Sequence, residues 1–333
     1  MIKDRVAGAP ISWGVCEVPG WGHQMAPGRV LAEMGALGLA ATEFGPDGFL
    51  PAGAAERADL LAAHGLRPLG GFAPVVLHDP DRDPLPEIRR TLTAFGVERS
   101  KATATPGTAA PAAGAGSAAG AGAGAGAGSA AAGPAGAGAP EGGLTLVLAA
   151  VHGLDGYDER PALDAAGWAA LLANLDRIAA LAAESGVRAV LHPHVGTMVE
   201  RSDEVRRVLD GSGIPLCLDT GHLLIGGVDP GELAARVPER IAHVHLKDVD
   251  AGLARDVQAG RIAYTDAVRK DIYRPLGGGD IDIAGIVRSL EGAGYGGWYV
   301  LEQDTILDRE PDDGAGPIED VRACLDFLAG IAA

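Results

Sequence analysis

The sequence predicts an α/β protein built as a (β/α)8 TIM barrel with a disordered Ala/Gly-rich insertion. Short apolar runs, typical of buried parallel strands, alternate with helical patterns along most of the 333-residue chain. The first run is not followed by the GxGxxG motif of a doubly wound dinucleotide-binding sheet. A single stretch of small residues interrupts the alternation. Together these observations favour a closed barrel of eight strand–helix units.

Eight apolar runs are the predicted strands. They are residues 9–14, 40–45, 67–75, 144–151, 187–194, 215–222, 241–248 and 298–304. Helical patterns lie between them, and the clearest are residues 28–37, 54–65, 85–96, 164–186 and 283–295. Several of these patterns end at or near a glycine, the residue that most often ends a helix.

Residues 102–143 consist almost entirely of Ala, Gly, Ser, Thr and Pro, with one charged residue and no aromatic residue. Such a stretch buries too little apolar surface to offset the entropy cost of ordering, so we expect it to be disordered. It falls between the third helix and the fourth strand, on the face of a barrel that lies away from the active site. We therefore expect residues 1–333 to form one barrel domain, with 102–143 as a flexible insertion without a role in the chemistry.

Charge and hydropathy exclude several classes of partner. The formal net charge of −17 repels phosphate backbones, so we expect no nucleic-acid partner. Outside the insertion no apolar stretch reaches the roughly 18 residues of a membrane span, and no secretory signal is visible. Three distant cysteines indicate reduced thiols rather than a disulfide framework. We expect a cytoplasmic protein without a membrane partner, and the sequence leaves open whether it forms a homo-oligomer.

Polar residues gather at the ends of the predicted strands, where the active site of a TIM barrel lies. These residues are Trp13, Glu43, His192, His194, Asp219, His222, His243, His245, Lys247, Asp248, Glu302 and Asp304. Random placement would scatter such residues along the chain. The clustering therefore predicts one polar site at the mouth of the barrel.

Imidazole and carboxylate groups dominate this predicted site. Because side chains alternate along a strand, His192 shares a face with His194, and His243 shares one with His245. Two imidazoles with two or three carboxylates make a site for one divalent metal ion. Mixed nitrogen and oxygen donors suit Mn²⁺, Co²⁺, Fe²⁺ or Zn²⁺ better than Ca²⁺.

Structural roles compete with functional ones at several of these positions. Asp219 could cap the turn that follows it, and Asp248 could cap a helix or loop. Glu43 could be an ion-pair partner, and Lys247 could pair with Asp248 or Glu302. His192, His222 and His243 could be buried histidines that only pack or hold a ligand in place.

The chain resembles the xylose-isomerase-like barrel superfamily of sugar isomerases, epimerases and type IV endonucleases in the strings CLDTGH, HVHLKD, PLGGGDID and VLEQD. It resembles the inosose dehydratases of inositol catabolism in APISWGVCEVPGWG, TEFGPDGFLP, GGFAPVVLH, LHPHVGTMVE and LCLDTGHLLIGGVDP. The resemblance covers the whole chain except residues 100–143, approximately.

The resemblance implies one divalent metal ion at the ends of strands five to eight, with Mn²⁺ or Co²⁺ the expected metals. Carried over position by position, the ligands would be His192, Asp219, His245 and Glu302. His222 would lie beside the metal or contact substrate. The resemblance also places Glu43 near the substrate and Trp13 in the apolar wall of the pocket.

One position departs from the pattern of the ketose epimerases in this superfamily. Those enzymes use two glutamates on opposite faces of the substrate, one from strand five and one from strand eight. His192 stands where the strand-five glutamate would be. The departure favours a dehydratase over an epimerase, because epimerisation needs two matched acid/base groups.

The expected activity is removal of water from a cyclic polyol ketone such as 2-keto-myo-inositol through an enediolate, with the metal polarising the carbonyl. His194 and Lys247 are the candidate proton carriers, His222 is held in reserve, and the metal and imidazoles would lower the pKa of Lys247.

Residues 256–282, after the seventh strand, are expected to form a lid from which Tyr273 and Arg274 reach the substrate. The alternative activity is a metal-dependent keto-sugar isomerase or epimerase, of the ketose 3-epimerase or hydroxypyruvate isomerase type. An abasic-site endonuclease is disfavoured by the acidic net charge.

Overall fold

The computed structural model describes residues 2–96, 143–154 and 156–331. Apart from Gly143, the predicted insertion at 102–143 lies outside the described residues. Within them, no helix is long and apolar enough to cross a membrane.

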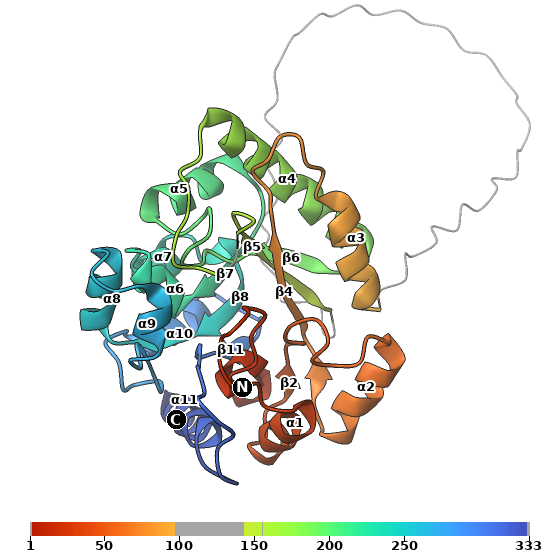
Figure 1. The fold of residues 1–333 in the computed structure, drawn as a ribbon, viewed down its shortest axis with the longest axis vertical. Helices are drawn as coiled ribbons and strands as arrows, with labels where there is room; N and C mark the ends of the chain where they lie inside the picture. Colours follow the sequence, from red (N-terminus) through yellow and green to blue (C-terminus); the bar gives the residue numbers. More distant parts are fainter. Residues whose placement is uncertain (1, 97–142, 155, 332–333) are drawn as a thin grey trace, which may run out of the picture.

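Parallel strands form the centre of the molecule, and helices surround them (Figure 1). The strands are β1 Val6–Gly8, β2 Ala41–Thr42, β3 Arg67–Pro68, β4 Gly70–Val75, β5 Thr145–Ala150, β6 Arg188–Leu191, β7 Leu216–Asp219, β8 Ile241–Leu246 and β11 Tyr299–Leu301. Their order in the sheet is β3-β2-β1-β11-β8-β7-β6-β5-β4, and every pairing is parallel.

Leu69 closes this sheet into a barrel. It joins β3 to β4, the two outermost strands in the sheet order, so residues 67–75 act as one strand. Its N–H donates to the carbonyl of Thr42 in β2 (3.0 Å), and its carbonyl accepts from the N–H of Thr145 in β5 (2.9 Å). The barrel therefore has eight strands, and the predicted (β/α)8 fold is confirmed.

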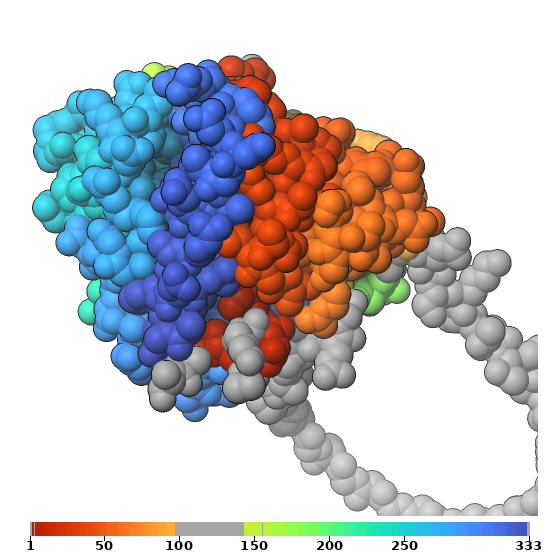
Figure 2. Space-filling view, turned by 90° about the horizontal axis from the view of Figure 1, so that it is seen from below, coloured from red at the N-terminus to blue at the C-terminus, as the bar shows by residue number. Residues whose placement is uncertain are grey.

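The helices pack their apolar faces on the outside of the barrel. They include α1 Pro27–Ala36, α2 Ala54–Ala63, α3 Leu85–Ala94, α4 Ala165–Glu184, α5 Ser202–Gly211, α7 Pro230–Arg236, α10 Ile283–Gly292 and α11 Pro317–Ile331. Helix α4 illustrates the pattern: the Asp164 carboxylate accepts from the N–H of Gly167 (2.8 Å) and caps the helix, while Leu171, Leu175 and Ile178 are fully buried. The two ends of the chain meet, because β1 pairs with β11, and α11 lies against the N-terminal segment (blue beside red in Figure 2).

The first predicted strand is displaced in the structure, and several others end earlier than predicted. The first strand is Val6–Gly8 rather than 9–14, because Pro10–Trp13 forms a 3-10 turn that ends at Gly14 with φ 74°. The sixth predicted strand stops at Asp219 instead of continuing to His222. Helix α6 Thr220–Ile225 begins there, since the Asp219 carboxylate accepts from the N–H of His222 (2.8 Å) and caps the helix.

The segment predicted as a lid is a packed part of the fold. It contains the last three residues of α8 Ala251–Gln258, then α9 Tyr264–Val268 and β10 Tyr273–Arg274, which pairs antiparallel with β9 Asp248–Val249. Tyr264 and Ile272 are buried in it, 2% and 0% exposed. This cover segment, residues 256–282, lies over one side of the barrel mouth and shares an apolar cluster with Trp21, Tyr157, Val195 and Ile225. Backbone hydrogen bonds between β10 and β9 anchor it.

Asp248 fixes the chain that follows β10. Its buried carboxylate accepts hydrogen bonds from the backbone N–H groups of Val249 (2.9 Å), Gly277 (2.8 Å), Gly279 (3.0 Å) and Ile281 (3.0 Å). A Cβ atom on Gly279 would lie 2.3 Å from the carboxylate, so glycine is required there. Asp248 therefore has the capping role that was one of its two sequence interpretations.

We expect Asp248→Ala to lower the free energy of unfolding by about 3 kcal/mol, because it leaves four backbone N–H groups, bonded to a buried carboxylate, without their acceptor. Urea denaturation followed by circular dichroism measures this change. Asp312→Ala, at an exposed position, serves as the control and should change the value by less than about 0.5 kcal/mol. Equal stability of the two variants would contradict the anchoring role of Asp248.

Candidate active site

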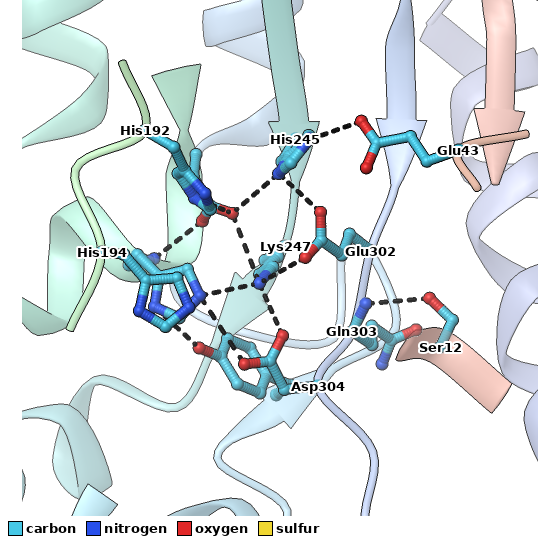
Figure 3. Close-up of polar contacts among 12 residues, drawn as sticks. Ser12, Glu43, His192, His194, His245, Lys247, Glu302, Gln303 and Asp304 are labelled. Atoms are coloured by element: carbon cyan, nitrogen blue, oxygen red, sulfur yellow. Dashed lines mark hydrogen bonds and ion pairs between the residues drawn. The ribbon is translucent and has the colours of Figure 1, made fainter. Parts of the chain in front are cut away.

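Four neighbouring strands bring the polar cluster together at their carboxyl ends (Figure 3). His192 directly follows β6, Asp219 ends β7, His245 lies in β8 and Glu302 directly follows β11. The parallel register pairs Asp219 with His245. All four residues are at least nine-tenths buried, so their polar atoms are shielded from bulk water and interact strongly with one another.

Asp219, His245 and Glu302 converge on one point. Nδ1 of His245 lies 2.5 Å from Oε2 of Glu302 and 3.4 Å from Oδ2 of Asp219. Both Nδ1 of His245 and Oε2 of Glu302 are buried without a correctly directed hydrogen bond from any described residue. Potential ligand atoms that face one another without hydrogen bonds are typical of a metal site. This set of one nitrogen and two oxygens fits a divalent ion.

His192 joins the cluster at its Asp219 edge. Its Nε2 lies 3.2 Å from Oδ2 of Asp219, the oxygen that also faces His245. Its Nδ1 is buried and has no hydrogen-bond partner among the described residues. The structure thus brings together all four residues predicted as metal ligands, with Asp219 at their centre.

Glu43 fixes the orientation of the His245 ring. Its Oε1 accepts from Nε2 of His243 (2.8 Å) and from Nε2 of His245 (3.0 Å). Burial opposes ionisation of Glu43, but the two imidazoles outweigh it and lower its pKa. With Nε2 held in this way, Nδ1 of His245 points to the cluster. Such carboxylate–histidine pairs orient the imidazole ligands of many metal sites.

Lys247 places a buried ammonium among the carboxylates. The side chain is fully buried, and Nζ lies 2.6 Å from Oδ1 of Asp304, 3.2 Å from Oε1 of Glu302 and 3.3 Å from Oδ2 of Asp219. Burial alone would lower the pKa of Lys247, but the three carboxylates raise it well above its usual value. The expectation of a lowered pKa was therefore wrong, because carboxylates rather than cations surround the ammonium. Conversely, His245 and Lys247 overcome the effect of burial and lower the pKa of Glu302 to about 2.

His194 and His222 stack on each other, with ring centroids 3.7 Å apart. Nδ1 of His194 lies 2.7 Å from the carbonyl of Val195, so Nδ1 carries the proton and Nε2 is the acceptor. Nε2 of His222 accepts from Lys247 (2.9 Å). Burial is the main cause that lowers the pKa of both histidines. His192 and then Lys247 add to it at His194, and His194 and then Lys247 add to it at His222. Both rings are therefore neutral.

Two tyrosines from the cover segment complete the buried network. The hydroxyl of Tyr264 donates to Asp304 and lies 2.8 Å from the hydroxyl of Tyr273, which lies 3.5 Å from Nδ1 of His222. Tyr273 thus reaches the cluster through His222. Arg274 points elsewhere, and its guanidinium lies 3.5 Å from the carboxylate of Asp250.

A cavity of about 570 Å³ opens beside the cluster. Glu43, His194, Glu302 and Asp304 form its polar side, and apolar and aromatic residues form much of the rest, including Trp21, Phe44, Leu50, Phe72 and Tyr157. Among the described residues, those lining the cavity do not include Trp13, Tyr273 or Arg274, which were predicted to contact substrate. Trp13 is fully buried, and its indole N–H donates to Glu33 (2.7 Å).

Asp304 belongs to the predicted strand-end cluster but was given no role in it, and Tyr157 was not predicted to belong to the site. Asp304 follows Glu302 by two residues, and this spacing could have indicated a second carboxylate on the same side of the chain. Tyr157 lies in an irregular loop between β5 and α4 and carries no periodic signal. Only the folded loop brings its ring onto His194, with centroids 4.5 Å apart.

We expect Mn²⁺ to raise the melting temperature of the metal-free protein by about 5 °C at a hundred-fold excess over Kd, and Asp219→Asn to remove most of this shift. Differential scanning fluorimetry with and without Mn²⁺ measures it. Asp229→Asn is a matched control, because Asp229 also caps a helix, α7, through the N–H groups of Gly231 and Glu232. A full shift in Asp219→Asn would rule out Asp219 as a ligand.

The family model for the xylose isomerase-like TIM barrel matches residues 141–328, more than half of the chain. The chain is 34% identical to an inosose dehydratase of Geobacillus thermodenitrificans over 151 residues and 37% identical to the rhizopine catabolism protein MocC of Rhizobium meliloti over 148 residues. Each alignment covers 44% of this chain and about half of the relative, 51% and 46%. An inosose dehydratase of Geobacillus kaustophilus is 29% identical over 90% of this chain and 87% of its own length.

Solved structures share the fold. An L-ribulose 3-epimerase superposes with a TM-score of 0.60 at 15% identity, over 98% of this chain and 94% of the other. The IolI protein, in a crystal structure with a zinc atom, superposes with a TM-score of 0.59 at 13% identity, over 98% and 97%. At these identities the likeness shows the fold alone.

Both resemblances seen in the sequence, to the barrel superfamily and to the inosose dehydratases, are confirmed by these matches. The chain belongs to the xylose isomerase-like TIM-barrel family.

Proposed function

We propose that this protein is a metal-dependent hydro-lyase that removes water from a keto-inositol such as 2-keto-myo-inositol. The observation that carries the proposal is the convergence of Asp219, His245 and Glu302 beside a cavity that a neutral imidazole, His194, also lines. The similarity to inosose dehydratases supplies the substrate class.

Asp219, His245 and Glu302 would hold the metal, with His192 as the fourth ligand. When bound, a divalent ion would supply Lewis-acid polarisation of the substrate carbonyl. Mn²⁺ and Co²⁺ are the metals we favour for this mixed donor set, and the zinc in the IolI structure makes Zn²⁺ the third metal to test.

His194 is the proposed base. Its Nδ1 is held by the carbonyl of Val195, which leaves Nε2 as a proton acceptor, and its lowered pKa keeps that nitrogen deprotonated at neutral pH. In this role Nε2 takes the proton from the carbon next to the carbonyl.

Asp304 is the proposed proton donor to the leaving hydroxyl. It lines the cavity, and burial raises its pKa although Lys247 opposes this effect. Lys247 and Tyr264 both donate hydrogen bonds to its carboxylate, so a proton given to the leaving hydroxyl can be replaced from the buried side. Lys247 thus acts through Asp304, and His222 acts through Lys247, rather than each touching the substrate.

A keto-sugar isomerase or epimerase is the competing proposal, since the same fold occurs in an L-ribulose 3-epimerase. Such an enzyme returns the proton to carbon instead of expelling hydroxide. We disfavour it because an imidazole, His192, stands at the strand-five position of the cluster, where a matched second carboxylate would serve epimerisation.

The decisive assay is incubation of the purified protein with 2-keto-myo-inositol and Mn²⁺ or Co²⁺. We expect a new ultraviolet absorbance from the conjugated product, abolished by a chelator and restored by added metal, because loss of water next to the carbonyl creates conjugation. Turnover of a ketose without any dehydration of the inosose would replace the dehydratase with the isomerase proposal.

We expect Glu302→Gln to lower both kcat and metal affinity by at least 100-fold, because it removes the charge of one proposed ligand beside Nδ1 of His245. Metal content by mass spectrometry and the dehydration rate measure the two effects. The control is Glu56→Gln, an exposed glutamate on α2. A variant that kept both its metal and its full rate would show that the site is assigned incorrectly.

A further inference from the structure

A hydrogen bond spans the mouth of the barrel above the cavity. The hydroxyl of Tyr157 donates to Oε1 of Glu17 (2.6 Å). Tyr157 belongs to the loop after β5, and Glu17 belongs to the loop after β1. Around the closed barrel, β1 and β5 are separated by β2 and the 67–75 strand on one side and by β11, β8, β7 and β6 on the other. The bond therefore links loops from distant parts of the rim.

Both partners face the cavity, so the bond forms part of its wall. Tyr157 is 8% exposed, and its ring lies on His194, the proposed base. Glu43 and Glu302 lie at the strand ends, whereas Glu17 and Tyr157 lie in the loops beyond them. The strand-end carboxylates and this pair therefore line the same cavity, the carboxylates from the strand ends and the pair from the loops.

Tyr157 is the fixed partner. Its carbonyl lies so close to Gly196, in the loop after β6, that a Cβ atom there would be 2.1 Å away. The next residue, Asp158, accepts from the N–H of Thr265 in α9 (2.9 Å). Arg160 pairs with Glu200 (3.0 Å) and Glu204 (2.8 Å). Glu17, by contrast, is exposed.

The pair has the chemistry to bind hydroxyl groups. The phenol donates to Glu17, so its own oxygen keeps lone pairs that accept hydrogen bonds, and the ionised carboxylate accepts several more. Hydrogen bonds to a charged acceptor are roughly twice as strong as those between neutral groups. A cyclic polyol offers hydroxyl groups all around its ring, including those away from the carbonyl carbon.

We propose that Tyr157 and Glu17 form a clamp that binds substrate hydroxyl groups from the loops that line the cavity. The clamp sets the specificity for a polyol ring rather than taking part in bond breaking. It rests on the proposed function, because it assumes a polyol ketone held at that cluster.

Two conservative variants test the clamp. Tyr157→Phe keeps the ring on His194 and removes the hydroxyl, and Glu17→Gln keeps an oxygen that accepts from Tyr157 while removing the charge. For each we expect KM for 2-keto-myo-inositol, and Kd for myo-inositol measured calorimetrically with Mn²⁺ present, to rise about ten-fold, with kcat changed less than about three-fold. In the double variant the effects should fall short of additive, because the two groups act as one unit.

Matched controls separate recognition from folding. Glu159→Gln removes an exposed charge from the loop that carries Tyr157, and Tyr295→Phe removes a hydroxyl that bonds the carbonyl of Trp298 at the amino end of β11. Neither should change KM or Kd. The clamp is overturned if Tyr157→Phe and Glu17→Gln leave both constants unchanged, or if they lower only kcat or only the melting temperature.

Assays of the wild-type protein distinguish failure of the clamp proposal from failure of the proposed dehydratase function. Absence of inosose dehydration rejects the dehydratase. Binding of myo-inositol, or turnover of a ketose, that still weakens about ten-fold in Tyr157→Phe would then support the clamp alone. A wild-type protein that binds neither kind of compound overturns the clamp as well.

Discussion

The buried ammonium of Lys247 balances the charge of the whole site. Three carboxylates from β7 and the chain after β11 lie within 3.3 Å of it, in an interior where isolated charges are costly. Without a cation at that point, Asp219, Glu302 and Asp304 would repel one another and favour their protonated forms. Because Nζ is held at the centre of the barrel mouth, the carboxylates of Asp219 and Glu302 remain ionised and aimed at a common point, as donors to a metal must be.

Hydrogen bonds from surrounding residues hold the side chains of the site in their orientations. Glu43 holds His245 from the side of β2, and the carbonyl of Val195 holds His194. The cover segment reaches the same network through Tyr264 and Tyr273. The side chains that face the cavity therefore have few alternative positions. Their positions depend in part on residues that do not line the cavity, such as Tyr264 and Tyr273. Such preorganisation is the usual source of catalytic power in enzymes.

The sequence was sufficient to predict the barrel and the residues of its mouth, because both follow from simple periodicities. Buried strands have continuous apolar runs, and a polar residue that ends such a run must lie at the strand's carboxyl edge. Three features could not be read in this way. Asp219 both faces the cluster and caps α6, although the sequence offered these as alternatives. The sign of the Lys247 pKa shift depends on which groups fold around it, and Tyr157 reaches His194 only through an irregular loop. Each depends on contacts between segments far apart in the chain.

The pairing of β4 with β5 has a consequence for folding and for the length of chain that can connect these two strands. Gly70 pairs with Thr145, so β4 and β5 are adjacent in space although most of the intervening chain, residues 97–142, lies outside the described structure. A Cβ atom on Gly70 would lie 1.9 Å from the carbonyl oxygen of Thr145, so this contact tolerates no larger residue. By contrast, doubling the length of a connecting loop costs only about 0.6 kcal/mol in closure entropy. The contact between β4 and β5 therefore restricts the size of the residues that meet there but tolerates a long connection between the strands. A longer connection slows the formation of the β4–β5 pairing during folding.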